Sequence, residues 1–215
     1  MPDILEAARA SARGGADWIT VHLRQDRRHI QDEDVYILKN KGPLPLNFEM
    51  AAAEEIVAIA LNVKPWCACL VPEKRQELTT EGGLDVAGGS AVISSAVRRL
   101  KKSGIEVSLF IDPDTEQVRA SHESGADAVE LHTGAYANAF GEQKKAELAR
   151  ITAGAQEAYS LGLKVNAGHG LDYDNVKAVS AIKEISELNI GYSIVCRAVF
   201  TGLETAVREM KSVIS

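Results

Sequence analysis

Short runs of apolar residues alternate with longer amphipathic segments along the whole chain. The short runs are rich in Val, Ile and Leu, are bounded by Gly, Pro or Asp, and have the length of β-strands. The predicted strands cover residues 18–23, 44–49, 66–71, 105–111, 128–133, 163–167 and 190–196. Between them, apolar residues recur with the spacing of a helix that buries one face, as in Ile93, Ala96, Val97 and Leu100.

A helix precedes the first predicted strand and changes how the elements are counted. It covers about residues 3–13, so the pattern predicts eight helices but seven strands. Strict alternation indicates a parallel sheet with right-handed crossovers, and both an open doubly wound sheet and a barrel usually begin with a strand. The pattern therefore favours an α/β fold, a single (β/α)8 TIM barrel domain over residues 1–215 whose first strand is absent from this chain.

The missing strand leads to an expectation about the natural protein. Without it, the strands at 18–23 and 190–196 would lack their shared neighbour and leave backbone N–H and C=O groups unpaired. We therefore expect the natural protein to carry roughly 20 further residues before Met1, enough for one strand and its loop.

Two segments half a chain apart resemble each other. "GADWITVHLR" (15–24) and "GADAVELHTG" (125–134) both have a Gly-Ala-Asp turn, a short strand, and then His22 or His132 at the same place. Such an echo suits a barrel with approximate two-fold repetition. Chance similarity between two such turns is the alternative, and the few matching residues leave both open.

Polar residues take one parity on four of the predicted strands, and apolar residues take the other. In a barrel the apolar parity packs beneath the helices, the polar parity points into the interior, and active sites lie at the carboxyl ends of the strands. His22, Glu49 and Glu130 have the polar parity, and His169 follows shortly after the sixth predicted strand. Alone, each is more often a hydrogen-bonded structural group. Together they predict one catalytic site.

The charged run "RQDRRH" (24–29) directly follows the first predicted strand. If this loop faces the site, Arg24 and His29 are placed to bind a phosphate or a carboxylate, because Arg makes bidentate contacts with such anions. The alternative is an ordinary solvated loop.

Two glycine-rich turns and one long polar segment add to the candidate site. "NAGHG" (166–170) follows the sixth predicted strand, and "NIG" (189–191) and "RAVFTG" (197–202) bracket the last. If the first strand is absent, these turns surround strands seven and eight of a barrel, where backbone N–H groups commonly bind phosphate. The polar segment 72–89 is too long for a minimal turn and is typical of an active-site lid.

Composition and charge narrow the class of partner. The net charge of −6 argues against nucleic acid or an anionic membrane surface. No apolar run approaches the ~18 residues that span a bilayer, so we expect no membrane association of that kind. Three cysteines are too few for a disulfide framework, and a cytoplasmic location fits.

Cysteines and metal ligands give no motif. Cys67 and Cys69 share a parity on one strand, and C-x-C without a second ligand pair favours small core residues. A metal site built from His22, Glu49 and His169 is conceivable, but no H-x-H or H-E-x-x-H motif supports it. We therefore expect no metal.

With these residues assembled, the chain resembles the pyridoxine 5′-phosphate synthase family of vitamin B6 biosynthesis. The resemblance runs from about residue 2 to residue 210. It is carried by "GADWITVHLRQDRRHI", "NFEMA", "LVPEKRQELTTEGGLDVAG", "VSLFIDPD", "ELHTG", "LGLKVNAGHGLDYDNV", "ELNIGYSIV" and "RAVFTGLETAVREM".

The resemblance implies a (β/α)8 barrel that condenses 3-amino-2-oxopropyl phosphate with 1-deoxy-D-xylulose 5-phosphate, without metal or redox cofactor. It implies acid/base roles for His22 and Glu49 and proton donation by His169. Glu130 would stabilise positive charge in intermediates. The expected ligands of the deoxyxylulose phosphate are Arg24, His29 and Thr79, and those of the amino-ketone phosphate are Gly170, Gly191 and Tyr192. The family assembles as a homo-octamer built from dimers.

Two departures from the family pattern stand out. The family's first strand and loop, with an Asn-x-Asp-His stretch and a downstream Arg, have no counterpart here. Tyr192 also stands where a His is expected, and tyrosine donates a hydrogen bond but does not become cationic.

The residues by themselves also fit two other functions. One is another barrel enzyme acting on a sugar phosphate, such as an epimerase or isomerase, and the other is a non-catalytic protein that binds phosphorylated ligands.

Overall fold

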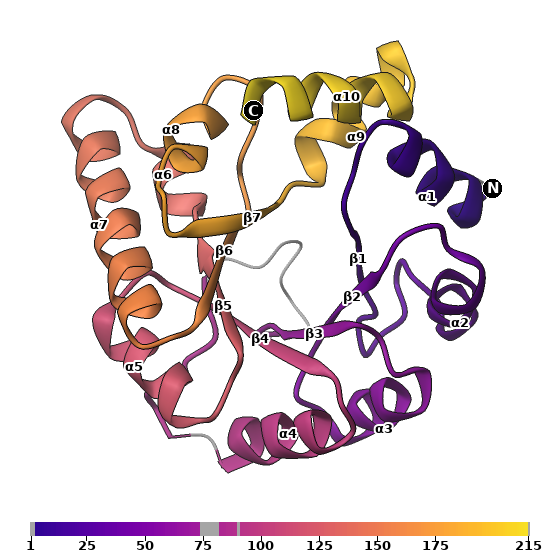
Figure 1. The fold of residues 1–215 in the computed structure, drawn as a ribbon, viewed down its shortest axis with the longest axis horizontal. Helices are drawn as coiled ribbons and strands as arrows, with labels where there is room; N and C mark the ends of the chain where they lie inside the picture. Colours follow the sequence, from indigo (N-terminus) through magenta and orange to yellow (C-terminus); the bar gives the residue numbers. More distant parts are fainter. Residues whose placement is uncertain (1–2, 74–81, 90, 215) are drawn as a thin grey trace.

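Seven parallel strands form one curled sheet that is surrounded by helices (Figure 1). The computed structural model describes residues 3–73, 82–89 and 91–214. The strands pair in sequence order, from β1 to β7. They are β1 (Ile19–His22), β2 (Leu46–Met50), β3 (Cys67–Leu70), β4 (Glu106–Ile111), β5 (Ala128–His132), β6 (Lys164–Gly168) and β7 (Ile185–Asn189).

Helices connect successive strands and cover the outside of the sheet (Figure 1). They are α1 (Ile4–Arg13), α2 (Asp32–Lys41), α3 (Glu54–Val63), α4 (Ala91–Lys102), α5 (Thr115–Glu123), α6 (Gly134–Asn138), α7 (Gly141–Ser160), α8 (Val176–Ser180), α9 (Tyr192–Thr201) and α10 (Leu203–Ile214). Within the described ranges this is two more than the eight predicted from the sequence. The short α6 lies in a loop, and α9 occupies a segment predicted as a strand.

The two outer strands of the sheet approach each other through their side chains. Thr20 Oγ1 of β1 donates a hydrogen bond to Asn189 Oδ1 of β7, at 3.0 Å. Outside the sheet, Arg13 Nε of α1 pairs with Glu204 Oε2 of α10 at 2.9 Å. No backbone ladder joins β1 to β7 in the part of the chain that the structure describes. The result is the α/β barrel architecture that the pattern predicts, with seven strands.

The apolar parity of the strands forms the core, as predicted. Phe48, Leu109 and Leu131 are completely buried between the sheet and the helices. The predicted apolar face of α4 is buried too, including Val97 and Leu100. Full burial of such side chains contributes roughly 1.5–3 kcal/mol each, relative to leaving them in water.

The prediction of a strand at residues 190–196 is wrong. The seventh strand is Ile185–Asn189, and Gly191 is the N-cap of α9. The Ile and Val residues of "IGYSIVC" (190–196) have the composition of a strand, but Val195 lies exposed on a helix. The true strand, ISELN, has only one β-branched residue and carries Glu and Asn, which are depleted in strands. "RAVFTG" (197–202) therefore lies at the end of α9 and just beyond it, not in a turn next to a strand.

The other six strands begin and end within two residues of their predicted limits. The two similar segments at 15–24 and 125–134 are equivalent junctions between a helix and a strand. Gly15 follows α1 and Gly125 follows α5, and both have left-handed φ angles, of 95° and 85°. Each junction leads into a strand that ends in a histidine, His22 or His132.

At the opposite end of the strands, two tryptophans pack against each other. Trp18 precedes β1 and Trp66 precedes β3, and their ring centroids lie 5.8 Å apart. This pair therefore belongs to the amino-terminal end of the sheet, away from the histidines at the strand ends.

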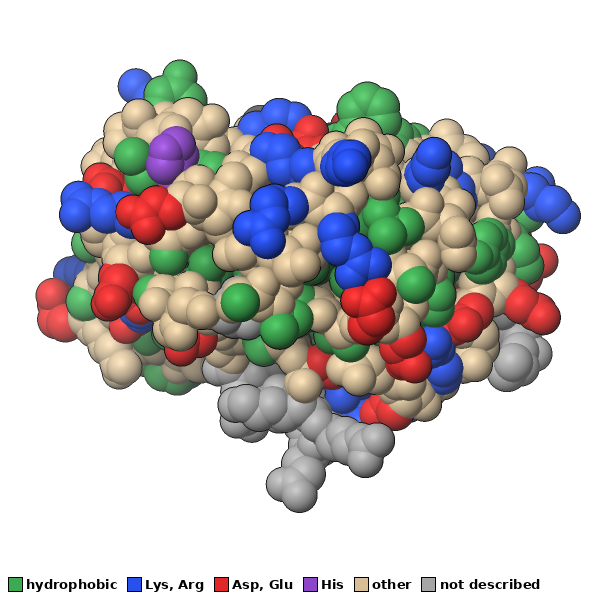
Figure 2. Space-filling model, turned by 90° about the horizontal axis from the view of Figure 1, so that it is seen from below, with side chains coloured by type: hydrophobic (Ala, Val, Ile, Leu, Met, Phe, Trp, Pro, Cys, Tyr) green, Lys and Arg blue, Asp and Glu red, His purple; other side chains and the backbone are tan. Residues whose placement is uncertain are grey.

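Charged residues of both signs are mixed on the surface. On the face drawn in Figure 2, Lys and Arg side chains are interspersed with Asp and Glu. Arg99 of α4, for example, pairs with Glu54 of α3, with Nη1 and Oε2 2.6 Å apart. No helix in the described ranges is long and apolar enough to cross a membrane.

Candidate active site

Polar side chains from five strands meet in the interior of the curled sheet. Asn189 Nδ2 of β7 donates to Glu130 Oε2 of β5 at 2.8 Å, and Cys69 Sγ of β3 donates to the same oxygen at 3.8 Å. Thr20 Oγ1 of β1 accepts a hydrogen bond from Asn47 Nδ2 of β2 at 3.4 Å and donates one to Asn189 Oδ1. The polar parity predicted from the sequence therefore faces the interior and forms one hydrogen-bonded network.

His22 and Glu49 lie side by side at the ends of β1 and β2. They are register partners in the parallel ladder, and His22 Nδ1 is 4.0 Å from Glu49 Oε2. Burial, reinforced by the charge of Arg24, lowers the pKa of His22 to about 4. Burial raises the pKa of Glu49 to about 7. At neutral pH the His22 imidazole is therefore uncharged. It stands beside the Glu49 carboxyl group, which is then close to the midpoint of its titration.

Glu130 is a buried carboxyl group in the middle of the network. Its side chain is 1% exposed, and burial, with the nearby charge of Glu49, raises its pKa well above the usual value. Among the described residues, Glu130 Oε1 has no hydrogen-bond partner, although it lies 4.0 Å from His169 Nδ1. A Cβ at Gly168 of β6 would overlap Glu130 Oε1, so this glycine makes room for the carboxyl group.

His169 is held in a strained turn after β6. Its φ angle is 73°, a left-handed conformation that residues other than glycine rarely adopt. Thr133 Oγ1 lies 2.7 Å from the carbonyl oxygen of Gly168 and 2.5 Å from that of His169, and its hydroxyl donates to this turn. The His169 ring packs on Phe110, with centroids 4.4 Å apart. Burial lowers the pKa of His169 to about 4.

Three further ionisable residues belong to this region and were not among the predicted site residues. His132 Nδ1 hydrogen-bonds Asp112 Oδ1 at 3.0 Å, and the His132 ring lies 5.7 Å from that of His169. Glu73 follows β3 and lies beside His22. Asp112 and Glu73 come just after strands, so the rule that site residues gather at carboxyl ends would have found them if it had been extended into the loops.

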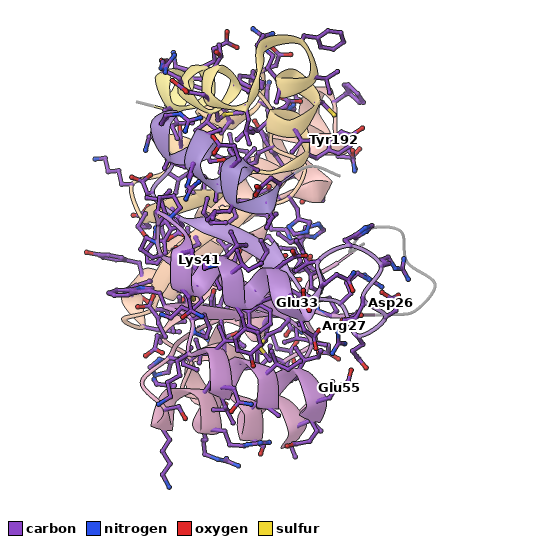
Figure 3. All side chains as sticks on the ribbon, turned by 90° about the vertical axis from the view of Figure 1, so that its right-hand side faces the viewer. Asp26, Arg27, Glu33, Lys41, Glu55 and Tyr192 are labelled. Carbon is purple, nitrogen blue, oxygen red and sulfur yellow. The ribbon has the colours of Figure 1, made fainter. Side chains whose placement is uncertain are left out.

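The arginine-rich loop after β1 is only partly directed at the site. Arg24 is buried, with Nε 3.5 Å from Asp26 Oδ1. Arg27 turns away and pairs with Asp32 at 2.6 Å and with Glu55 at 3.2 Å. Figure 3 shows Asp26 and Arg27 on this loop, which projects from the right-hand side of the molecule.

The other predicted binding residues have different surroundings. His29 is exposed on the same loop. Gly170 lies in the turn after β6 with a left-handed φ of 77°, and a Cβ there would stand 2.6 Å from Ala137 Cβ. Gly191 caps α9 directly after β7, and Tyr192 is 87% exposed, on the same side of Figure 3 as Asp26. Thr79 lies outside the described residues, as does the middle of the predicted lid at 72–89, residues 74–81.

Two cysteines are buried on one strand, and the described residues form no metal-binding cluster. Cys67 and Cys69 are buried on β3, as expected of core residues, and burial raises the pKa of both thiols. Within residues 3–73, 82–89 and 91–214, no group of three or more His, Cys, Asp or Glu side chains is placed to hold a metal ion.

The curled sheet and the polar strand ends together define a barrel protein with histidines and carboxyl groups converging on one interior site. The fold agrees with solved structures of low sequence identity. KGPDC of Streptococcus mutans has a TM-score of 0.69 at 13% identity, over 98% of this chain and 90% of that one. Phosphoribosyl anthranilate isomerase of Thermus thermophilus has a TM-score of 0.62 at 15% identity, over 98% and 93%.

Sequence comparison identifies the family. Residues 1–215 match the family model described as pyridoxal phosphate biosynthesis protein PdxJ. Pyridoxine 5′-phosphate synthase of Idiomarina loihiensis is 54% identical over 214 residues, covering 99% of this chain and 88% of the relative. The enzyme of the same name from Colwellia psychrerythraea is 56% identical over 211 residues, covering 98% and 86%. This chain belongs to the PdxJ family, as its sequence motifs indicated.

Proposed function

We propose that this protein is an enzyme that condenses 3-amino-2-oxopropyl phosphate with 1-deoxy-D-xylulose 5-phosphate, giving pyridoxine 5′-phosphate, inorganic phosphate and water. Membership of the PdxJ family supports this reaction, since relatives more than half identical to the chain are named pyridoxine 5′-phosphate synthase. The observation that carries it is the convergence of His22, Glu49 and His169 at the carboxyl ends of three strands, with the buried Glu130 of β5 among them.

The reaction needs several proton transfers, which suits this set of groups. The amine of one substrate attacks a carbonyl carbon of the other, and water leaves as the imine forms. Ring closure then makes a carbon–carbon bond, and phosphate and water are lost. Each step moves a proton to or from oxygen, nitrogen or carbon, and side chains that titrate near neutral pH serve such steps best. Glu49, with its pKa raised to about 7, has the property required.

The four residues have distinct proposed roles. His22 and Glu49 exchange protons with the reacting atoms at the ends of β1 and β2, and His169 donates a proton to a leaving group on the other side. Glu130 stabilises the positive charge that develops on nitrogen in the imine intermediates. Its Oε1 supports this role, because that oxygen is buried and has no hydrogen-bond partner among the described residues. No cofactor is needed for these steps.

We propose two phosphate sites at the strand ends. Arg24, His29 and Thr79 would hold the deoxyxylulose phosphate, with Arg24 supplying a fixed charge close to His22. Gly170, Gly191 and Tyr192 would hold the amino-ketone phosphate. The position of both glycines in turns after adjacent strands supports this, because backbone N–H groups in such turns bind phosphate in many barrels.

Arg24→Lys is expected to weaken binding of a phosphorylated substrate more than it alters the pH dependence of turnover. Lysine keeps the charge but loses the two parallel N–H donors of the guanidinium group. Dissociation constants of both substrates, measured by calorimetry, test this. Arg27→Lys is the matched control, since Arg27 pairs with Asp32 and Glu55. Unchanged affinity of the Arg24 variant for both substrates would remove this residue from the phosphate site.

The proposed function is tested by mixing both substrates with the protein and following pyridoxine 5′-phosphate by liquid chromatography and mass spectrometry. We expect product only when both substrates are present. Conversion of the sugar phosphate alone would indicate an epimerase or isomerase, and binding without turnover would indicate a phosphate-ligand binding protein. Either result would contradict the proposal.

The proposal extends to the domain organisation, location and assembly of the enzyme. We propose a single domain over residues 1–215, a cytoplasmic location, and a homo-octamer built from dimers. The outer face of α9 supports self-association, because Tyr192, Val195, Val199 and Phe200 follow helical spacing and are all at least 60% exposed. Apolar stripes of this kind are common at contacts between subunits.

A further inference from the structure

Glu73 occupies a place that joins two parts of the proposed site. It lies three residues beyond the end of β3, and its side chain is 5% exposed. Glu73 Oε1 accepts a hydrogen bond from the backbone N–H of Gln25 at 2.8 Å and lies 3.8 Å from Arg24 Nε. Its other oxygen, Oε2, lies 3.7 Å from His22 Nε2. One buried carboxylate thus faces the proposed base and the proposed phosphate-binding arginine together.

The two facing atoms of His22 and Glu73 both need a partner. His22 Nε2 and Glu73 Oε2 are buried, and neither has a hydrogen bond to any other described residue. Buried polar atoms in proteins are nearly always hydrogen-bonded. A small movement would bring this donor and acceptor, now 3.7 Å apart, within hydrogen-bonding distance. Catalytic hydrogen bonds are often long in the absence of substrate and tighten when it binds.

His22 is therefore placed between two carboxyl groups, one at each ring nitrogen. Nδ1 faces Glu49 at 4.0 Å, and Nε2 faces Glu73 at 3.7 Å. The ionisable groups that act on the imidazole from all surrounding elements are Glu49 of β2, Glu73 after β3, Arg24, Asp26 and His29 of the loop after β1, and His169 after β6.

We propose that Glu73 is a positioning residue for the condensation: it accepts the Nε2 proton of His22 and so leaves Nδ1 as the basic nitrogen, while its other oxygen keeps the Arg24 loop in place. This inference rests on the proposed function. When substrate gives a proton to Nδ1, the imidazolium that forms keeps its Nε2 proton and is stabilised by the Glu73 carboxylate. In serine hydrolases the buried Asp orients its His by the same physical principle.

The first test is Glu73→Gln. Glutamine has the same shape, and its carbonyl oxygen can still accept from the Gln25 N–H, which leaves the amide NH₂ facing His22 Nε2. An NH₂ group donates and does not accept, so His22 has to move its proton to Nδ1. We expect ¹⁵N NMR of the imidazole to show this change of tautomer and kcat to fall about 10²-fold, a loss typical of misplaced catalytic groups, with a smaller change in KM.

Glu55→Gln is the matched control. Glu55 also pairs with an arginine of the loop after β1, at 3.2 Å, but its side chain is 60% exposed and lies away from His22. Figure 3 labels Glu55 and Arg27 at this position. An exposed pair contributes little, so we expect kcat within about twofold of the parent and an unchanged His22 tautomer.

Glu73→Asp separates charge from position. It keeps the carboxylate on a shorter side chain, so it should retain the Nε2–H tautomer and recover part of the lost kcat. If Glu73→Gln leaves both the tautomer and kcat unchanged, Glu73 is not a positioning residue. If the parent forms no product, the proposed function fails, and the tautomer in the two Glu73 variants still decides whether this carboxylate orients His22.

Discussion

His22→Gln, Glu49→Gln and His169→Gln are each expected to lower turnover about 10²–10⁴-fold, the usual loss when a general acid or base is removed. The reason is geometric. All three side chains lie at carboxyl ends of parallel strands, and His22 and Glu49 are register partners only 4.0 Å apart at their nearest N and O atoms. A glutamine keeps much of the volume of each group but cannot exchange a proton near neutral pH.

Two measurements separate this loss from unfolding. Circular dichroism should give the parent spectrum for each variant, and substrate dissociation constants should change much less than kcat. His122→Gln is the matched control for the histidines, because His122 is exposed near the end of α5, and α5 leads into the start of β5, at the end of the sheet opposite the site. If each of the three site variants kept more than half of the parent activity, the acid/base assignment would be wrong.

Glu49→Gln is also expected to stabilise the fold at alkaline pH. Burial raises the pKa of Glu49 from 4.5 to about 7, so the folded protein binds this proton more tightly than the unfolded chain does. The stability that this provides is fully present below pH 4.5 and is lost as the pH rises through about 7. Above pH 7 the parent holds a buried charge, and glutamine removes it. We expect the variant to be more stable than the parent at pH 8, by about 1–3 kcal/mol.

Denaturant unfolding of both proteins at pH 5 and pH 8 measures this effect. Glu187 also has a pKa raised to about 7 by burial, but it is present in both proteins and cancels in the difference. Glu123→Gln, on an exposed position of α5, controls for the loss of a surface carboxylate and should change stability by no more than about 0.5 kcal/mol at either pH. A Glu49 variant less stable than the parent by the same amount at both pH values would contradict the prediction.

Much of the fold could be predicted because buried segments have a recognisable local composition and alternation of apolar residues. Strands such as β4 and β5 are buried on both faces along most of their length, and their Val, Ile and Leu residues mark them. The alternation that hides Val129 and Leu131 also turns Glu130 inward, so the same pattern predicted both core and site.

The wrong or missing predictions concern features that depend on tertiary contacts. The apolar residues at 190–196 look like a strand because composition does not reveal that Val195 stays exposed on a helix. Glu73 and Asp112 were missed because they lie in loops, where no periodicity marks direction. Their importance depends on contacts with His22 and His132, which lie 51 and 20 residues away in sequence.

The packing of Trp18 on Trp66 has a practical consequence for all these variants. The chain contains two tryptophans, and both lie before strands, at the end of the sheet opposite the histidines. Their ultraviolet emission should therefore respond when the sheet melts and stay silent when a side chain at the strand ends is exchanged. Intrinsic fluorescence thus reports folding independently of activity, since an inactive variant that is still folded should have the same emission spectrum as the active parent.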